Sequence, residues 1–313
     1  MKVYAGYYNE ESILKGSSSG GIFYALSEYV VENNGIVVSS VYNPKAKELN
    51  YVICKTIEDV KACRGSKYFQ SNPGDILREV VPYIKNLKMV LICGTPCHVA
   101  GFKSYLATSH IDVSRVFYVD LFCHGVPSPY VWKEYVKRIE RIEKDTSIDV
   151  SFKDKRNGWF LPFAYLKFPN KEYEIREFDR LYYKDLISRP CCYECRYSNL
   201  ERVGDFSIGD FWSAKEKQPS IYNHLGVSSI LVNTEKGNEL FNAIKGKLVY
   251  ETASIEDSSQ QCLRKPVEKP SDRAVFWRDI KQKDFGKVFD SYTKVSPRQR
   301  IVSKIKRVLG KQK

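Results

Sequence analysis

The chain has 313 residues, of which 43% are hydrophobic and 28% are charged, the profile of a soluble globular protein with one large or two modest domains. No apolar run approaches the roughly 18 residues that span a membrane, and the first residues lack the apolar core of a signal peptide, so we expect a cytoplasmic location. The net charge is +13, but eight Lys or Arg residues and no acid lie between Ser291 and Lys313. We expect no nucleic-acid binding, because this basic tail lacks an aromatic stacking platform.

The first half of the chain alternates predicted strands and helices. A strand at 2–7 is followed by the run Ser17–Gly21 and then by a helix, whose apolar residues from Ile22 to Val31 fit one face. Further strands are expected at 36–41, 49–54, 89–93 and 116–122, and further helices at 57–63, 74–87, 98–106 and 129–145. This order predicts an α/β fold with a mostly parallel or mixed sheet flanked by helices.

The pattern changes after residue 146. The turn at Pro169–Lys171 joins two strands of a predicted hairpin. Strands are expected at 150–153, 163–177, 205–212, 226–232 and 247–250, and a helix at 235–244. We therefore divide the chain into an N-terminal α/β part (1–146), an interleaved α+β part that carries a C-x-x-C (147–290) and a basic amphipathic tail (291–313).

Four of the nine cysteines are predicted to form one metal site. Clustered cysteines in a reducing compartment more often bind metal or act in catalysis than form disulfides. Cys192 and Cys195 make the C-x-x-C, whose spacing aims two sulfurs at one centre. Cys97 and Cys123 each follow an apolar run that predicts a buried strand, and ligands bind at the carboxyl ends of strands in open α/β sheets.

The residues alone leave alternatives open for this site. The cysteines could be buried free thiols, or the ligands of a four-cysteine zinc site. Cys93 and Cys191 are alternative ligands, which we rank lower because Cys93 ends a strand that points into the core.

Two loops have the residues of an anion site. In Ser17–Gly21, glycine allows close backbone approach, and the N–H groups at the start of the following helix favour an anion. The alternative is an ordinary helix start capped by serine. In the second loop, Arg64–Tyr68, Arg64 and Lys67 suit a phosphate, and the alternative is a solvated turn.

Several short motifs occur together in one order along the chain. They are Ser18–Gly21, Arg64–Tyr68, Gly94–Cys97, Cys123–Pro129, Phe152–Lys155, Cys192–Cys195 and Ile208–Trp212. As a set, over roughly residues 1–245, they resemble the beta-subunit family of the deazaflavin (coenzyme F420) hydrogenases and dehydrogenases. That family includes many bacterial members linked to surface-polysaccharide synthesis.

The resemblance implies FAD on an α/β fold beside a [4Fe-4S] cluster. The cluster cysteines fall on Cys97, Cys123, Cys192 and Cys195. The implied flavin contacts are Ser18, Ser19, Gly20, Gly21, Arg64, Ser66 and Lys67. His98 stands where the family usually has glutamine, which puts a cofactor contact there in doubt. Since no cysteine precedes Cys54, we expect the ferredoxin-like module of longer members to be absent.

The expected function is an oxidoreductase that passes electrons from a one-electron donor, ferredoxin or another subunit, to a two-electron acceptor. The acceptor is the deazaflavin coenzyme or a small organic substrate such as a glycan precursor. The alternative is a zinc-stabilised binding protein whose basic tail recognises an acidic partner.

Secondary roles are assigned to four features. The tail is either a helix packed on the body or a peripheral contact to anionic lipid. His124 could tune the cluster, residues 153–156 form a charged turn that could gate substrate access, and Asp210 caps a turn or contacts the flavin.

Overall fold

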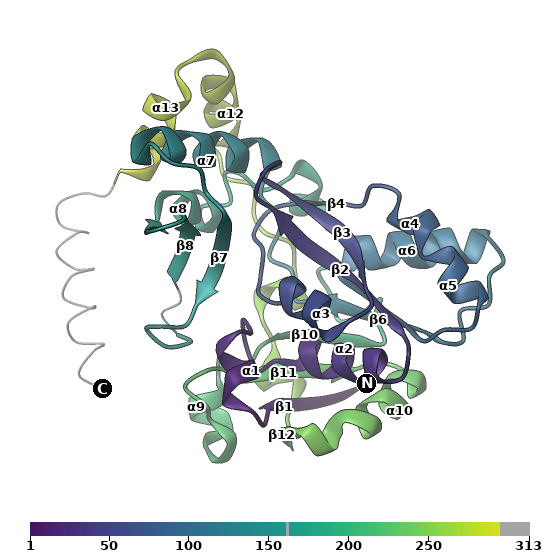
Figure 1. Ribbon diagram of the computed structural model, residues 1–313. Coiled ribbons are helices and arrows are strands. Elements are labelled where there is room, and N and C mark those ends of the chain that lie inside the picture. Colours follow the sequence, from purple (N-terminus) through teal and green to yellow (C-terminus); the bar gives the residue numbers. More distant parts are fainter. Residues whose placement is uncertain (161–162, 295–313) are drawn as a thin grey trace.

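The computed structural model describes residues 1–160 and 163–294, and a large sheet forms its centre (Figure 1). In spatial order its strands are β12 (Leu248–Thr252), β1 (Lys2–Tyr8), β11 (Ser228–Val232), β10 (Phe206–Asp210), β6 (Val116–Leu121), β5 (Val90–Gly94), β2 (Ile36–Asn43), β3 (Glu48–Cys54) and β4 (Ser71–Asn72). Because β1 lies between β11 and β12, the predicted ranges 1–146 and 147–290 both contribute strands to this sheet.

The direction of the strands makes the sheet mixed. The neighbouring strands β10, β6, β5 and β2 run parallel to one another. The pairs of β1 with β11 and β12, of β10 with β11 and of β2 with β3 are antiparallel. The predicted class, a mostly parallel or mixed sheet flanked by helices, is confirmed.

Helices cover both faces of the sheet. Leu91 and Cys93 of β5 pack in one apolar cluster with α2 (Ile22–Glu32), whereas Val90 and Ile92 pack in another with α6 (Pro96–Thr108). The first face also holds α3 (Ile57–Cys63) and α10 (Glu235–Ile244). This burial on both faces explains why β5 is apolar throughout rather than alternating.

One predicted helix is wrong as drawn from the sequence. The apolar periodicity at 74–87 predicted a single helix, but the structure has α4 (Ile76–Glu79) and α5 (Val81–Lys85). Pro82 lies in the first turn of α5. Because proline has no N–H and its ring clashes with the preceding turn, it begins a helix more readily than it continues one.

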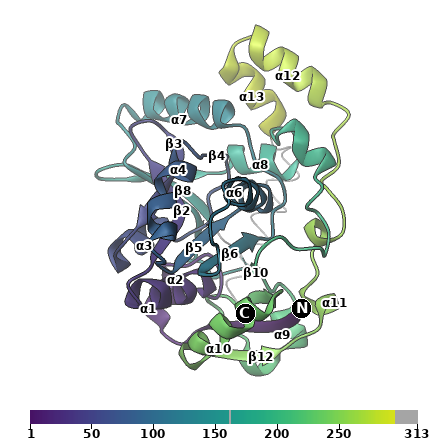
Figure 2. The same cartoon turned by 90° about the vertical axis from the view of Figure 1, so that its right-hand side faces the viewer.

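A smaller sheet and four helices form a second apolar core. The sheet has the order β7 (Asp149–Asp154), β8 (Phe163–Lys167), β9 (Glu172–Ile175), and the helices are α7 (Pro129–Glu143), α8 (Glu177–Tyr183), α12 (Arg273–Gln282) and α13 (Phe285–Thr293). Trp132 of α7 is fully buried there and stacks on Phe69. Figures 1 and 2 both show α7, α12 and α13 at one end of the molecule and β12 and α10 at the opposite end.

Three further α-helices are short: α1 (Glu11–Lys15), α9 (Ala214–Lys217) and α11 (Ile255–Ser258). Of the predicted tail, 291–313, the first residues belong to α13, which ends at Thr293, and everything beyond Lys294 lies outside the described residues. In the ranges 1–160 and 163–294, no helix combines the length and the apolar character needed to cross a membrane.

Candidate functional site

A cavity of about 290 Å³ lies where the parallel strands end. Gly94 of β5, Leu121 of β6 and Asp210 of β10 line it, so it occupies the carboxyl edge at which α/β sheets bind ligands. A second hollow of about 570 Å³ lies along α7 and is lined almost wholly by charged side chains of that helix and of the turn after it. Ligand sites are concave and mostly apolar with a few polar groups, and the cavity at the strand ends fits that description better.

The serine–glycine loop forms one wall of the cavity. Ser18, Ser19 and Gly21 line it, together with Ile22 at the start of α2. Gly21 has a left-handed backbone (φ 78°) and precedes α2, and no side chain caps this helix end. The serine cap considered from the sequence is therefore absent from the described residues. The first N–H groups of α2 lie beside the cavity, as an anion site requires.

Gly20 is required by packing within the protein, whereas the sequence predicted close approach of its backbone to an anion. It does not line the cavity; its N–H donates to the hydroxyl of Ser228 (2.9 Å), and its carbonyl accepts from the N–H of Tyr8 (2.7 Å). A Cβ at this position would lie 2.4 Å from the carbonyl oxygen of Gly6. Glycine at position 20 thus allows the loop to pack against β1 and β11.

The Arg64–Tyr68 loop lies directly beside the serine–glycine loop. The N–H of Ser66 donates to the Ser18 hydroxyl, and both residues line the cavity. The guanidinium of Arg64 lies 5.4 Å from the centre of the Tyr24 ring. Its Nε and Nη1 are buried, without a hydrogen-bond partner among the residues described, and burial lowers its pKa. Buried unpaired donors are costly, so these N–H groups suit an anionic ligand in the cavity.

Lys67 has partners that the sequence did not reveal. Its Nζ donates to the carbonyl oxygens of Cys63 (2.8 Å), Arg64 (3.1 Å) and Gly65 (3.0 Å). An ammonium group has three donors, and all three are used here. Lys67 therefore holds the loop in shape and contributes positive charge, while Arg64 has the unpaired donors.

The predicted metal ligands come together from three segments. Cys97 lies in the first turn of α6, Cys123 follows β6, and Cys192 lies in the 3₁₀ turn Pro190–Glu194; all three line the cavity. Cys195 follows that turn and is an electrostatic neighbour of both Cys123 and Cys192. The turn is held near Cys123 by the hydrogen bond from the N–H of Arg189 to the carbonyl of Val126 (3.0 Å).

Backbone N–H groups point at two of these sulfurs. The N–H of Gly125 bonds to Cys123 and that of Val126 to Cys192, and each bond lowers the pKa of its thiol. Burial has the larger, opposite effect, and together with the neighbouring cysteines it raises the pKa of Cys192 to about 11 and that of Cys123 higher still. Crowded thiols with such pKa values need a positive centre to be held as thiolates.

Four thiols that are electrostatic neighbours are the donor set that an iron–sulfur cluster takes. Within residues 1–160 and 163–294, no three His, Cys, Asp or Glu side chains converge closely enough to hold a single metal ion. The assignment of Cys97, Cys123, Cys192 and Cys195 as ligands stays a prediction. Of the lower-ranked alternatives, Cys93 is buried in the core and Cys191 is exposed, and both reach the cavity wall.

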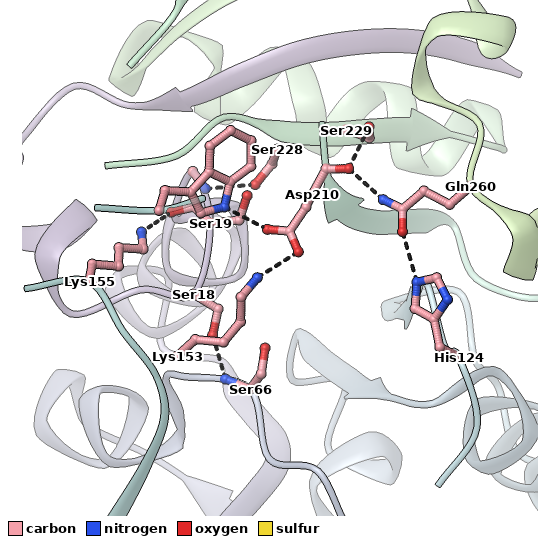
Figure 3. A network of polar contacts seen from close by, with 12 residues as sticks. Ser18, Ser19, Ser66, His124, Lys153, Lys155, Asp210, Ser228, Ser229 and Gln260 are labelled. Atoms are coloured by element: carbon pink, nitrogen blue, oxygen red, sulfur yellow. Dashed lines mark hydrogen bonds and ion pairs between the residues drawn. The ribbon is translucent and has the colours of Figure 1, made fainter. Parts of the chain in front are cut away.

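Asp210 is the centre of a polar network that the sequence only partly indicated (Figure 3). One carboxylate oxygen accepts from Lys153 (2.6 Å) and the other from the indole N–H of Trp159 (2.9 Å). The backbone carbonyl of Asp210 accepts from Gln260 (2.6 Å), whose Oε1 is 2.8 Å from Nε2 of His124. The network links the end of β10 to the residue after Cys123.

The predicted charged turn at 153–156 is wrong for its two lysines. The side chain of Lys153 is only 5% exposed, and Lys155 is buried. Lys155 donates to the carbonyls of Leu14 (3.0 Å), Ser19 (2.8 Å) and Leu225, and burial lowers its pKa to about 7. Lys155 thus fixes the serine–glycine loop, a role that no local pattern could have indicated.

His98, the departure from the family pattern, also lies on the cavity wall. Its Nδ1 is 3.0 Å from the hydroxyl of Tyr51, and burial lowers its pKa. A neutral imidazole at this position can accept or donate one hydrogen bond at each nitrogen, as the tautomer allows.

Together, the fold and the site define an α/β protein with a ligand cavity at the carboxyl edge of parallel strands and a group of thiols on its wall. The chain belongs to the coenzyme F420 hydrogenase/dehydrogenase beta subunit family. The family's N-terminal model matches residues 3–78, and its C-terminal model matches residues 87–258. The resemblance inferred from the motifs is therefore confirmed.

Two relatives match most of this chain. The chain is 26% identical over 283 residues to the coenzyme F420-dependent sulfite reductase of Methanocaldococcus jannaschii, covering 84% of this chain but only 40% of that protein. It is 26% identical over 255 residues to the coenzyme F420 hydrogenase subunit beta of Methanococcus voltae, covering 79% and 82%. A chain of the F420-reducing [NiFe] hydrogenase complex from Methanosarcina barkeri shares the fold, with a TM-score of 0.57, 20% identity and coverage of 83% and 84%.

Proposed function

We propose that this protein is an oxidoreductase that binds FAD and a [4Fe-4S] cluster in and beside the cavity at the strand ends. One observation carries the proposal: the Arg64 side chain, with its buried unpaired donors, and the uncapped start of α2 belong to the wall of the same cavity that Cys97, Cys123 and Cys192 line. An anion-binding wall and a thiol wall that face one cavity suit a nucleotide cofactor next to a metal cluster.

The anion-binding wall would hold the diphosphate of FAD. Arg64 would donate its free N–H groups, and the start of α2 at Gly21 would add backbone N–H groups and a positive dipole end. Ser18 and Ser66 are joined by a hydrogen bond and keep the two loops together. Lys67 and Lys155 hold the loop backbones, so the wall is pre-organised before any ligand binds.

The thiol wall would hold the cluster through Cys97, Cys123, Cys192 and Cys195. When bound, a flavin exchanges two electrons with an organic partner and one at a time with a cluster. The residues of this chain would bind both groups and bring them to one cavity. Asp210, held by Lys153 and Trp159, places a carboxylate at the cavity wall.

We further propose that ferredoxin or another electron-donor subunit docks near the exposed Cys191 and passes electrons to the cluster. Cys191 is exposed and lies in the same turn as Cys192, so a partner can reach the thiol wall from this side. The proposed acceptor is coenzyme F420 or an organic substrate, such as a glycan precursor. The names of the relatives, a sulfite reductase and a hydrogenase subunit, support an electron-transfer role of this kind.

The cluster is tested with neighbouring cysteines as matched variants. Protein purified without oxygen should contain iron and acid-labile sulfide in near-equal amounts. Cys192→Ala should lose both, whereas Cys191→Ala, a change of the same size one residue away, should keep them. Stoichiometric zinc without sulfide would overturn the cluster, and iron loss only in Cys191→Ala would move the ligand to that residue.

The flavin wall is tested with Arg64→Met. A charge-assisted hydrogen bond is worth about 1.5–3 kcal/mol, so the variant should bind FAD about 10- to 100-fold more weakly. Because the wild-type donors are buried and unpaired, the variant without FAD should be as stable as wild type or more stable. Unchanged FAD affinity, measured by fluorescence titration, would show that Arg64 does not contact the cofactor.

The rate at which each candidate reoxidises the reduced flavin identifies the electron acceptor. The holoprotein is reduced with dithionite and mixed with coenzyme F420 or with candidate sugar substrates, and flavin absorbance is followed. Fast reoxidation by coenzyme F420 supports the deazaflavin, and fast reoxidation by a sugar substrate supports an organic acceptor. A flavin that cannot be reduced through a fully loaded cluster would end the electron-transfer proposal.

A further inference from the structure

A second pair of cysteines lies beside the cavity, apart from the four predicted ligands. Cys54 is the last residue of β3, and Cys63 is the last residue of α3. Their sulfurs are 3.5 Å apart, and both residues are free thiols. A disulfide has an S–S distance of about 2.05 Å, so the two sulfurs need to approach by only about 1.5 Å.

The two thiols differ in their access to the cavity. Cys63 lines the cavity, whereas Cys54 has no exposed surface and packs in the apolar core behind it. A reagent in the cavity therefore meets the sulfur of Cys63 first. This is the arrangement of an attacking and a resolving cysteine, with the resolving thiol already in contact.

The surroundings of Cys63 favour its thiolate. The hydrogen bond between the Cys54 and Cys63 thiols, a hydrogen bond with the Ser39 hydroxyl and the nearby ammonium group of Lys67 lower the pKa of Cys63 despite its burial. Asp59 and the carboxyl-terminal end of α3 raise the pKa of Cys63. The same contact, together with burial, raises the pKa of Cys54.

We propose that Cys54 and Cys63 form a redox-active dithiol, which a small two-electron oxidant in the cavity converts reversibly to a disulfide. With a diazene dicarboxamide as the oxidant, the Cys63 thiolate adds to the N=N bond, and the adduct takes up one proton. The Cys54 sulfur then attacks Cys63, forms the S–S bond and releases the hydrazine, which carries both electrons and both protons. A dithiol such as dithiothreitol reverses the reaction by thiol–disulfide exchange.

This pair would be a two-electron centre on the wall of the cavity. It goes beyond the proposed function, because its chemistry requires neither FAD nor iron. Disulfides in a reducing compartment are usually transient and catalytic or redox-sensing, and a pair of this kind fits that use. The proposal would therefore stand or fall independently of the cofactor assignments.

The test uses the full chain purified without oxygen. The protein is treated briefly with the diazene, remaining thiols are blocked with N-ethylmaleimide, and peptides are identified by mass spectrometry. We expect a cross-linked peptide pair that contains Cys54 and Cys63, with the loss of two hydrogens, and recovery of both thiols after dithiothreitol. Assignment by peptide separates this pair from oxidation of the other seven cysteines.

Two serine variants make the order of events visible. In Cys54→Ser, glutathione disulfide should leave a stable mixed disulfide on Cys63, because the resolving thiol is missing. In Cys63→Ser, Cys54 should stay unmodified, because no exposed surface of it faces the cavity. Buried cysteines often serve only in packing. Unchanged Cys54 and Cys63 thiols in oxidant-treated wild type would assign the pair to packing and overturn the proposal.

Discussion

The buried ion pair of Arg202 with Asp120 gives the sharpest prediction for stability. The two side chains are only 2% and 0% exposed, so water screens their interaction little. Arg202 also donates to the hydroxyl of Ser207 (3.1 Å) and to the carbonyls of Tyr197 (3.0 Å) and Asn199 (3.2 Å). One side chain therefore ties the segment after the C-x-x-C to the strand that leads to Cys123.

Arg202→Met should destabilise the protein strongly. It leaves the Asp120 carboxylate buried, with the N–H of Gly204 (2.7 Å) as its remaining partner. Breaking a buried pair from one side costs about 3–5 kcal/mol, which corresponds to a fall of more than about 1 M in the urea midpoint. Arg78→Met, at a solvated pair with Asp75, is the matched control and should leave the midpoint unchanged.

The double variant Arg202→Met with Asp120→Asn separates lost contacts from the buried charge. Because it removes both charges, it should be more stable than the sum of the two single changes predicts, by at least about 1 kcal/mol. An Arg202→Met midpoint within about 0.2 M of wild type would refute the reasoning, since it would mean that the pair is solvated or dispensable.

Three further predictions concern the loop, its lysine and the tail. Gly20→Ala should lower the free energy of unfolding by about 3 kcal/mol, because a Cβ would meet the backbone of Gly6. Gly21→Ala should lower it by about 1–2 kcal/mol, because alanine is strained at the left-handed φ of this residue. Equal thermal stability of the two variants would contradict this. An unfolded lysine keeps its proton up to about pH 10.4, whereas folded Lys155 loses its proton at about pH 7. Above pH 7 the unfolded state therefore binds more protons, so the free energy of unfolding of the wild type should rise with pH, relative to Lys155→Met, by up to about 1.4 kcal/mol per pH unit. A constant difference between the two proteins from pH 7 to about 9 would show that Lys155 is not desolvated as the structure implies. Removal of residues 294–313 should abolish any salt-sensitive flotation with anionic vesicles if the tail contacts lipid, and wild-type protein that does not float favours a tail packed on the body.

The sequence by itself determined the class of the fold and the motifs of the site. Apolar runs such as 89–93 predicted β5 because a strand covered by helices on both faces must be apolar throughout. The residues of the two loops and the cysteine spacings were visible because they are local in the chain. The helix predicted at 74–87 failed for a local reason as well, the proline at position 82.

Only the tertiary structure decided which of these residues meet. A lone lysine in a charged run looks solvated, yet Lys155 is buried against the carbonyls of Leu14, Ser19 and Leu225, all far from it in the chain. Gly20 is glycine because the backbone of Gly6 lies beside it, and Lys67 is occupied by its own loop, while Arg64 keeps free donors. Such roles depend on contacts between residues far apart in the chain, and neither spacing nor composition encodes these contacts.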